Sequence, residues 1–266
     1  MRADAAPGAA APRAALRIAA LVALLLTGIA LSPLARRLPA GLVRRWCRLL
    51  VRAAGVRMRV TGAAVPDGGV LLVANHISWL DVPLLAAVRP ARTLAKKEIG
   101  EWPVAGPVAA RGAVFIDRDR LRALPDTVAH LASVLRSGAA LAVFPEGSTW
   151  CGRAQGTFRR AAFQAALDAG VPVQPVRIRY RRPDGGPTTA PAFVGEDTLL
   201  ASVWRVTTAR ALVAEVEIRD AIRPGAHEDR RALASAAERS VLRDPARVPR
   251  PALRRAGATP VPDTAP

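Results

Sequence analysis

Short apolar segments alternate with longer amphipathic segments over most of the chain, and this alternation limits the fold more than any other feature of the sequence. The short segments with the composition of buried β-strands are residues 69–74, 93–95, 112–116, 140–144, 173–180 and 211–218. The intervening segments with the spacing of amphipathic helices include residues 121–137, 159–169 and 228–242. Such alternation predicts an α/β fold with a largely parallel sheet flanked by helices. Gly185 and Gly186 form a turn signal that predicts a further strand pairing after the fifth segment.

The chain length predicts one such domain with an appendage, because 266 residues are too few for two ordinary domains. We expect a disordered N-terminus at residues 1–13, a membrane anchor with an amphipathic helix at 14–55, the α/β domain at 56–243, and a disordered tail at 244–266.

The predicted anchor contains an uncharged apolar run at residues 18–34. As a helix this run would extend roughly 25 Å, against a bilayer core of roughly 30 Å. A single membrane span, a shallow re-entrant anchor and a signal peptide all remain open as interpretations. Arginines are more frequent after the run than before it, which predicts that the downstream domain stays on the cytoplasmic side.

A second helix with two different faces is predicted after the anchor. Its apolar face has Leu42, Trp46, Leu49, Leu50 and Ala53, and another face has Arg44, Arg48 and Arg52. This pattern favours a helix that lies at a membrane interface. The alternative is a surface helix that packs on the protein's own core and turns its arginines to the solvent.

The net charge of +18 indicates an acidic partner: anionic lipid headgroups, a phosphorylated substrate or a nucleic acid. A membrane-tethered nucleic-acid-binding protein is therefore an alternative of another class. Aromatic residues are only 4% of the chain and no nucleic-acid-binding module is recognisable, so we expect no nucleic-acid partner. Histidines and cysteines do not cluster, so we expect no metal site.

His76 and Asp81 are the leading candidates for catalysis. They occur where an apolar strand ends and a helix is expected, which is where open α/β sheets place their sites. A regular helix would separate two residues five apart by about 140°. They can therefore meet only if His76 precedes the helix, and a helix starting at Ser78 would allow this. Ser78 and Asp81 also form a capping pattern, so Asp81 has a purely structural alternative.

Four sequence blocks resemble the lysophosphatidic acid acyltransferase family of glycerolipid acyltransferases. They are Asn-His-x-x-x-x-Asp at 75–81, Gly-x-x-Phe-Ile-x-Arg at 112–118, Phe-Pro-Glu-Gly at 144–147 and Val-Pro-Val-x-Pro-Val at 171–176. The blocks occur in the family's order and cover roughly residues 56–180. The resemblance implies an acyltransferase domain at 56–243.

The resemblance also implies a mechanism in which His76, oriented by Asp81, removes the proton of an acceptor hydroxyl. This hydroxyl would then attack a thioester directly, without an acyl-enzyme intermediate. The residues agree, because Ser148 and Cys151 do not occur in a nucleophile-elbow pattern. No cofactor is expected. The expected partners are membrane lipids, a lysophospholipid acceptor, and acyl-CoA or acyl carrier protein as the donor.

Further candidate residues are implied for substrate binding. Arg118 can pair with a phosphate in a bidentate manner, although it could also be a solvated arginine between two aspartates. Glu146 and Gly147 belong to the block associated with acceptor binding. Lys97 is one of only two lysines in the chain and occurs in a segment similar to the family's, but a surface role is equally open.

One departure from the family concerns the acceptor. The commonest form of the third block has arginine two residues after the glycine, whereas this chain has Thr149. Family frequency favours 1-acylglycerol-3-phosphate as the acceptor, with phosphatidic acid as the product. The sequence Glu-Gly-Ser-Thr at 146–149 is also similar to branches that act on lyso-ornithine lipid or other lysolipids. Arg153, Arg159 or Arg160 would then be candidates to compensate for the missing guanidinium.

Overall fold

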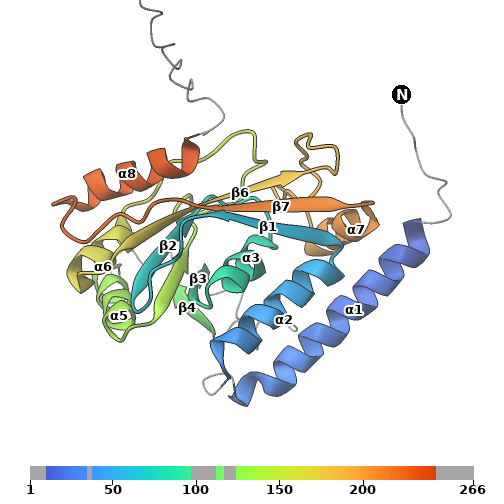
Figure 1. The fold of residues 1–266 in the computed structure, drawn as a ribbon, viewed down its shortest axis with the longest axis horizontal. Coiled ribbons are helices and arrows are strands. Elements are labelled where there is room, and N and C mark those ends of the chain that lie inside the picture. Colours follow the sequence, from blue (N-terminus) through green and yellow to red (C-terminus); the bar gives the residue numbers. More distant parts are fainter. Residues whose placement is uncertain (1–9, 35–37, 97–111, 117–123, 244–266) are drawn as a thin grey trace, which may run out of the picture.

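In the computed structural model, which describes residues 10–34, 38–96, 112–116 and 124–243, a seven-stranded sheet lies between two layers of helices (Figure 1). The strands are β1 (Val56–Gly62), β2 (Val70–Ala74), β3 (Arg92–Lys96), β4 (Ala113–Ile116), β5 (Ala140–Val143), β6 (Val173–Arg181) and β7 (Leu212–Ile218). Their order is β1-β7-β6-β2-β5-β3-β4. All neighbouring strands are parallel except β6 and β7, so the predicted α/β fold with a largely parallel sheet is confirmed.

The helices are α1 (Ala10–Leu31), α2 (Ala40–Ala53), α3 (Asp81–Val88), α5 (Leu124–Arg136), α6 (Ala161–Ala169), α7 (Leu199–Thr208) and α8 (Arg230–Leu242), with a short 3₁₀ turn η2 (Ser32–Leu34). Local signals explain several ends. Asp229 caps α8 by accepting the backbone N–H groups of residues 231 and 232 at 2.6 and 2.8 Å. Gly170 ends α6 in the left-handed conformation, with φ of 63°.

The central strand β2 explains why helices must cover both faces of the sheet. All of its side chains are buried, and because strand residues alternate in direction, Leu71 and Val73 pack among α5, α6 and α8. Val70, Leu72 and Ala74 face the other core cluster, which α2 and α3 cover. Burial of each Val or Leu contributes about 1.5–3 kcal/mol, so this strand is a rigid base for the loop that follows it.

The start of α1 corrects one prediction. We expected disorder at residues 1–13, but α1 begins at Ala10, so the expectation is wrong for residues 10–13. Alanine has the highest helix propensity and Pro12 is tolerated in the first turn. In addition, Arg13 Nη2 donates to the carbonyl oxygen of Thr208 at 2.9 Å. The remaining residues of the predicted disordered ends, 1–9 and 244–266, lie outside the described residues.

Helix α1 with η2 is apolar and lies against the rest of the protein. Residues 11–34 are long and apolar enough to cross a membrane by length and composition alone. Near its start, Arg17 donates to the carbonyl oxygens of Thr207 and Ala209 at the end of α7. Near its other end, Trp46 of α2 packs closely over Gly28, where a Cβ would lie 2.5 Å from the ring. Contacts at both ends therefore hold α1 along α2 and α7 (Figure 1).

Helix α2 packs on the protein through a face that is rotated from the predicted apolar face. Cys47, Leu50 and Val51 are buried, and the helix contacts α3, β1 and α1. The inner face of α2 therefore packs on the core of the protein, as the alternative to a membrane-interface helix predicted. Leu42 and Leu49, predicted to face the same side as Leu50, are 48% and 45% exposed. The sequence could not fix the rotation because apolar residues occur on both sides of the arginine stripe.

Two further differences concern β-structure and α7. The turn at Gly185 leads only to an isolated bridge between Arg181 and Pro187. The antiparallel partner of β6 is instead β7, which follows after α7. Helix α7 was not predicted from the sequence, although Thr198 supplies the side-chain oxygen that caps its first turn.

Candidate active site

The loop between β2 and α3 leaves the sheet at Asn75. The Asn75 side chain makes the two hydrogen bonds to β6 that the next backbone groups of β2 would otherwise make. Asn75 Nδ2 donates to the carbonyl oxygen of Ile178 at 3.0 Å, and the Ile178 N–H donates to Asn75 Oδ1 at 2.8 Å. Both backbone groups of Ile178 on β6 are therefore satisfied after the β2 backbone has turned away. This exchange allows the next residue, His76, to leave the strand direction at the carboxyl edge of the sheet.

His76 is held on several sides. Its N–H donates to Glu146 Oε2 at 3.2 Å, and its carbonyl oxygen accepts the Trp150 N–H at 2.8 Å. Its ring stacks on Phe144, with centroids 4.0 Å apart and an interplanar angle of 15°. Nδ1 lies 2.9 Å from Asp81 Oδ2, and the side chain is 21% exposed. The imidazole is therefore fixed in orientation but still reaches the surface.

Asp81 is fully buried, and both oxygens of its carboxyl group accept hydrogen bonds. Oδ2 accepts from the backbone N–H groups of Ile77 and Ser78 at 2.6 and 2.8 Å, in addition to His76. Oδ1 accepts from the hydroxyl of Tyr180 at 2.7 Å. The predicted helix start is wrong by three residues, since α3 begins at Asp81. The bond from Ser78 N–H is nevertheless the return contact of a capping pattern, so one carboxylate both orders the loop and orients the imidazole.

Tyr180 remains a hydrogen-bond donor across the range of physiological pH. Burial, and next the charge of Asp81, raise the pKa of Tyr180 well above its usual value of 10. With the Tyr180 hydroxyl on Oδ1 and backbone donors on Oδ2, Asp81 can hold the His76 Nδ1–H and leave the lone pair of Nε2 free. This is the arrangement that a general base for an alcohol needs.

Glu146 is the second buried carboxyl group beside His76. Burial raises its pKa to about 7, the His76 N–H opposes this shift, and the negative charge of Asp81 adds to it. Oε1 of Glu146 has no hydrogen-bond partner among the described residues. Gly147 has a φ of 81°, and a Cβ there would lie 2.8 Å from Nε of Arg159. Glycine is therefore required both by the backbone and by the close approach of Arg159.

Other predicted site residues are not all placed beside His76. Arg118 and Lys97 lie outside the described residues, so their roles stay predictions. Thr149, at the position where the family commonly has arginine, donates its hydroxyl to the carbonyl oxygen of Phe193. Among the candidates to replace that guanidinium, Arg159 lies against Gly147 and Arg153 lines a pocket next to Ile77.

Three residues of this site were not given a role from the sequence: Asn75, Phe144 and Tyr180. Tyr180 had a signal that could have been used, because it is the only tyrosine in a chain poor in aromatic residues. Asn75 and Phe144 belong to the recognised blocks, but their contacts depend on how β2, β5 and β6 lie side by side.

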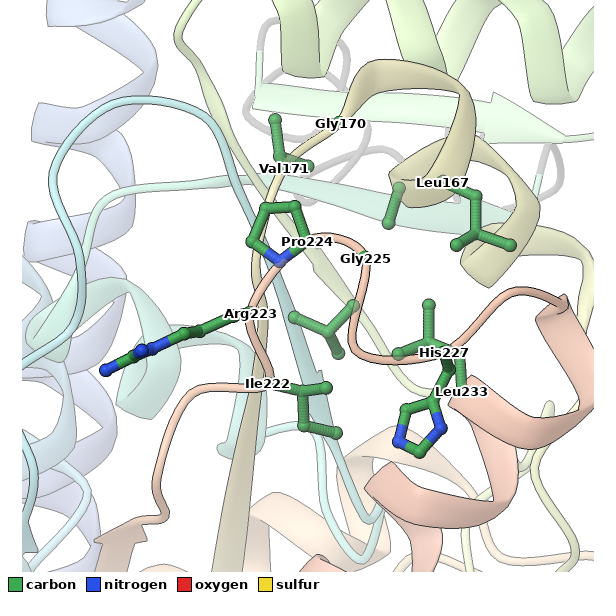
Figure 2. Close-up of a pocket in the computed structure, with 11 residues that line it drawn as sticks. Leu167, Gly170, Val171, Ile222, Arg223, Pro224, Gly225, His227 and Leu233 are labelled. Atoms are coloured by element: carbon green, nitrogen blue, oxygen red, sulfur yellow. The ribbon is translucent and has the colours of Figure 1, made fainter.

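A separate hollow of about 30 Å³ lies at the other end of β6, between the end of α6 and the start of α8 (Figure 2). Leu167, Val171, Ile222 and Leu233 line it together with His227. It is too small for an acyl chain, so we treat it as a gap in packing. In the described part of the chain, no group of three or more His, Cys, Asp or Glu side chains could hold a metal ion.

Comparisons with known proteins identify a family that matches this chain. Residues 57–179 match the family model described as Acyltransferase. The chain is 38% identical over 219 residues to a lyso-ornithine lipid O-acyltransferase of Pseudomonas aeruginosa, covering 81% of each chain. It is 36% identical to a 1-acyl-sn-glycerol-3-phosphate acyltransferase of Neisseria gonorrhoeae, covering 68% of this chain and 71% of the relative.

A solved structure shows the same fold. The crystal structure of the 1-acyl-sn-glycerophosphate acyltransferase of Thermotoga maritima superposes with a TM-score of 0.56 and 19% identity, over 76% of this chain and 77% of that one. The α/β architecture is thus shared, and the sequence relatives are similar over most of their length. The chain belongs to the acyltransferase family.

Proposed function

We propose that this protein transfers a fatty acyl group from acyl-CoA or acyl carrier protein to the free hydroxyl of a lysolipid at the cytoplasmic face of the membrane. The observation that carries the proposal is the 2.9 Å contact between His76 Nδ1 and the fully buried Asp81. This contact fixes one imidazole nitrogen and leaves the other for the acceptor hydroxyl.

The reaction would proceed by direct transfer. Nε2 of His76 takes the proton as the acceptor oxygen attacks the thioester carbonyl carbon, and the carbon–sulfur bond then breaks. The departing thiolate takes the proton back from the imidazolium. Within the described residues no hydroxyl or thiol hydrogen-bonds to the His76 ring, which supports attack by the acceptor itself rather than by an enzyme nucleophile.

Two acceptors are candidates: 1-acylglycerol-3-phosphate and lyso-ornithine lipid. Two observations favour lyso-ornithine lipid. Relatives named for it in Pseudomonas aeruginosa and Brucella abortus align with 81% and 84% of this chain, against 68% for the Neisseria gonorrhoeae relative. In addition, Thr149 replaces the guanidinium with a hydroxyl that is already bonded to Phe193.

The proposed membrane contact involves the outer face of α1. Leu16, Val22 and Leu26 are 73%, 48% and 57% exposed, while the opposite side of the helix is fixed to α2 and α7. A helix that is held along the domain in this way fits an interfacial anchor better than a separate membrane span. The arginine excess after α1 supports a cytoplasmic active site.

The substitution His76→Ala tests the proposal. We expect acyl transfer by the full chain in vesicles to fall by about 10²–10⁴, because the base is lost. The protein should stay folded, because Asp81 keeps two backbone donors and the Tyr180 hydroxyl, although loss of the stacked imidazole should lower stability by about 1–3 kcal/mol. Transfer is measured with labelled acyl-CoA and each of the two acceptors.

His130→Ala provides the matched control, since His130 is exposed on α5 and should tolerate the change. If folded His76→Ala protein kept more than about a tenth of wild-type turnover, the proposal would be wrong, because general-base catalysis supplies at least about a hundredfold.

A further inference from the structure

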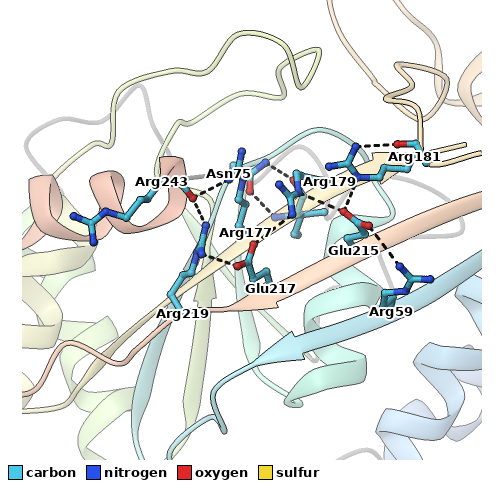
Figure 3. A network of polar contacts seen from close by, with 11 residues as sticks. Arg59, Asn75, Arg177, Arg179, Arg181, Glu215, Glu217, Arg219 and Arg243 are labelled. Carbon is cyan, nitrogen blue, oxygen red and sulfur yellow. Dashed lines mark hydrogen bonds and ion pairs between the residues drawn. The ribbon is translucent and has the colours of Figure 1, made fainter. Parts of the chain in front are cut away.

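Arg205 of α7 uses its guanidinium group in a different way from the arginines of the sheet. On β6, Arg179 and Arg181 pair with Glu215 of the neighbouring strand β7, so these ion pairs join two strands (Figure 3). The guanidinium group of Arg205 instead binds residues 190–197, which we call the bridging loop. This loop leads from the end of β6 to the start of α7.

All three nitrogens of the Arg205 guanidinium group donate to the bridging loop. Nε donates to the carbonyl oxygen of Ala190 at 2.7 Å, and Nη2 donates to that of Ala192 at 2.6 Å. Nη1 and Nη2 also donate to the two carboxyl oxygens of Asp197, at 3.3 and 2.5 Å. The hydrogen bond from Arg205 lowers the pKa of Asp197, so this pair stays ionised at neutral pH. Only the planar fork of an arginine can make all of these bonds at once.

The bridging loop connects Arg205 to the catalytic loop (residues 75–80) through one peptide group. The carbonyl oxygen of Ala192 and the N–H of Phe193 belong to the same peptide group, which is planar and trans. Its carbonyl oxygen accepts from Arg205, and its N–H donates to the carbonyl oxygen of Ile77 at 2.9 Å. The guanidinium group therefore fixes the direction in which the Phe193 N–H points.

A second peptide group continues this chain of hydrogen bonds to Asp81. It contains the carbonyl oxygen of Ile77 and the N–H of Ser78, which donates to Asp81 Oδ2 at 2.8 Å. The same carboxyl oxygen lies 2.9 Å from Nδ1 of His76. Three hydrogen bonds thus lead from Arg205 to the oxygen that orients the imidazole. Both peptide groups point their N–H toward the carboxyl group, so the bonds polarise one another in the same direction.

Thr149 joins the bridging loop to the other loop of the site. Its hydroxyl donates to the carbonyl oxygen of Phe193. The next N–H along the chain, that of Trp150, donates to the carbonyl oxygen of His76 at 2.8 Å. Phe193 is therefore bonded to the catalytic loop through its N–H and to the 144–150 loop through its carbonyl oxygen.

We propose that Arg205 is a positioning residue for the acyl transfer, and that it acts by holding the bridging loop against the peptide group that donates to Asp81. Thr149, at a position where the family commonly has arginine, supports the same arrangement from the 144–150 loop. The inference rests on the proposed function and adds two residues that act on the imidazole through the backbone.

The first experiment compares wild type with Arg205→Gln in the full chain in vesicles, with labelled acyl-CoA and lyso-ornithine lipid. Because Arg205 acts on the orientation of His76, kcat should fall about tenfold while both KM values stay within about twofold. Arg89→Gln is the matched control. Arg89 also binds a carboxylate and a loop carbonyl, those of Asp67 and Gly68, at 2.8 Å each. Both partners precede β2, at the opposite end of that strand from His76, so kcat should not change.

The variants Thr149→Val and Thr149→Ser test the same arrangement without changing a charge. Valine has the shape of threonine but no hydroxyl, so kcat should fall about three- to tenfold, the effect of losing one hydrogen bond. Serine keeps the hydroxyl and should retain kcat within about twofold of wild type. This pair also decides the proposal if Arg205→Gln does not fold.

Hydrogen exchange of backbone amides gives a readout that needs no turnover. Peptides that cover residues 75–81 should exchange faster in Arg205→Gln than in wild type, and in Arg89→Gln they should not. Unchanged exchange, unchanged kcat in folded Arg205→Gln, or Thr149→Ser as slow as Thr149→Val would overturn the proposal. A higher acceptor KM with unchanged kcat would also overturn it and assign the residue to substrate binding. Wild-type protein that acylates no lysolipid would instead refute the proposed function, while hydrogen exchange would still decide whether Arg205 orders the catalytic loop.

Discussion

Each of the two loops beside the imidazole contains or directly precedes one buried carboxyl group, and the two groups have different hydrogen-bond partners. The loop at 75–80 follows β2 and leads to Asp81, while the loop at 144–150 follows the neighbouring strand β5 and contains Glu146. Asp81 accepts hydrogen bonds from two backbone N–H groups, one phenol and the imidazole. Glu146 accepts the His76 N–H, and its other oxygen has no partner in the described part of the chain.

The difference shows how two buried acids can lie beside the proposed base without placing two full negative charges next to it. Four hydrogen-bond donors compensate the burial of the Asp81 carboxylate, which orients Nδ1 of His76. Glu146 lacks that compensation, and burial raises its pKa to about 7. A second negative charge would favour a protonated imidazole, which cannot accept a proton. The neutral form of Glu146 can still accept the His76 N–H and fix the loop.

Asp81→Asn is expected to have the largest effect, because it removes the charge on which the first loop depends. The amide cannot accept all four hydrogen bonds, and it no longer fixes the His76 tautomer. We expect kcat to fall by about 10²–10⁴. Stability should fall by about 1–3 kcal/mol, because buried donors lose their acceptor. Acyl-transfer assays and chemical unfolding measure the two effects separately.

The exposed Asp126 in the first turn of α5 offers a matched control, and Asp126→Asn should leave turnover unchanged. Folded Asp81→Asn protein with nearly wild-type kcat would show that the imidazole does not need this carboxylate, and the contrast between the loops would lose its catalytic meaning.

Tyr180→Phe should have a smaller effect of the same kind. It removes one donor and leaves Oδ1 of Asp81 buried without a partner, at a cost of about 1–3 kcal/mol in stability. The His76 contact is on Oδ2 and remains, so we expect kcat to fall by about tenfold or less, with both KM values unchanged. Because the pKa of Tyr180 lies well above 10, the ratio of variant to wild-type kcat should be constant between pH 6 and 9. A ratio that changes in this range would contradict a purely positioning role for the phenol.

The contact between His76 and Asp81 was predictable from the sequence because it depends on local geometry. Two residues five apart can meet only across a helix start, and the strand signal before Asn75 placed that start approximately. The predicted helix start was Ser78, whereas the observed start is Asp81. The two differ because the Asp81 carboxylate binds backbone N–H groups that precede the helix. The catalytic use of the pair remains a prediction from chemistry and resemblance.

Contacts between distant segments could not be predicted in the same way. The hydrogen bonds of Asn75 to Ile178 and of Tyr180 to Asp81 join residues that are 103 and 99 positions apart in sequence. Predicting them requires knowing that β6 lies beside β2. The antiparallel pairing of β6 with β7 was also missed, since the turn at Gly185 suggested a nearer partner. The strand pattern indicated the type of sheet, but not which strands are neighbours.

Glu146→Gln should have the smallest effect on turnover, and its effect on stability should depend on pH. The pKa of this carboxyl is 4.5 when it is unperturbed and about 7 in the folded protein. Between these values the folded state binds more protons than the unfolded state, so the free energy of unfolding falls as pH rises. Glutamine does not titrate but can still accept the His76 N–H. The melting temperature of Glu146→Gln should therefore match wild type near pH 4.5 and exceed it above pH 7.

Thermal unfolding from pH 4.5 to 9 measures this difference, and subtracting the two curves removes the titration of all other groups. Glu196→Gln serves as the matched control, because Glu196 is exposed. The difference in melting temperature between Glu196→Gln and wild type should not change with pH. Parallel curves for wild type and Glu146→Gln would mean that Glu146 is ionised at neutral pH in the folded protein. The second loop would then place a full negative charge beside His76, and the two carboxyl groups would no longer differ in the way that their hydrogen bonds imply.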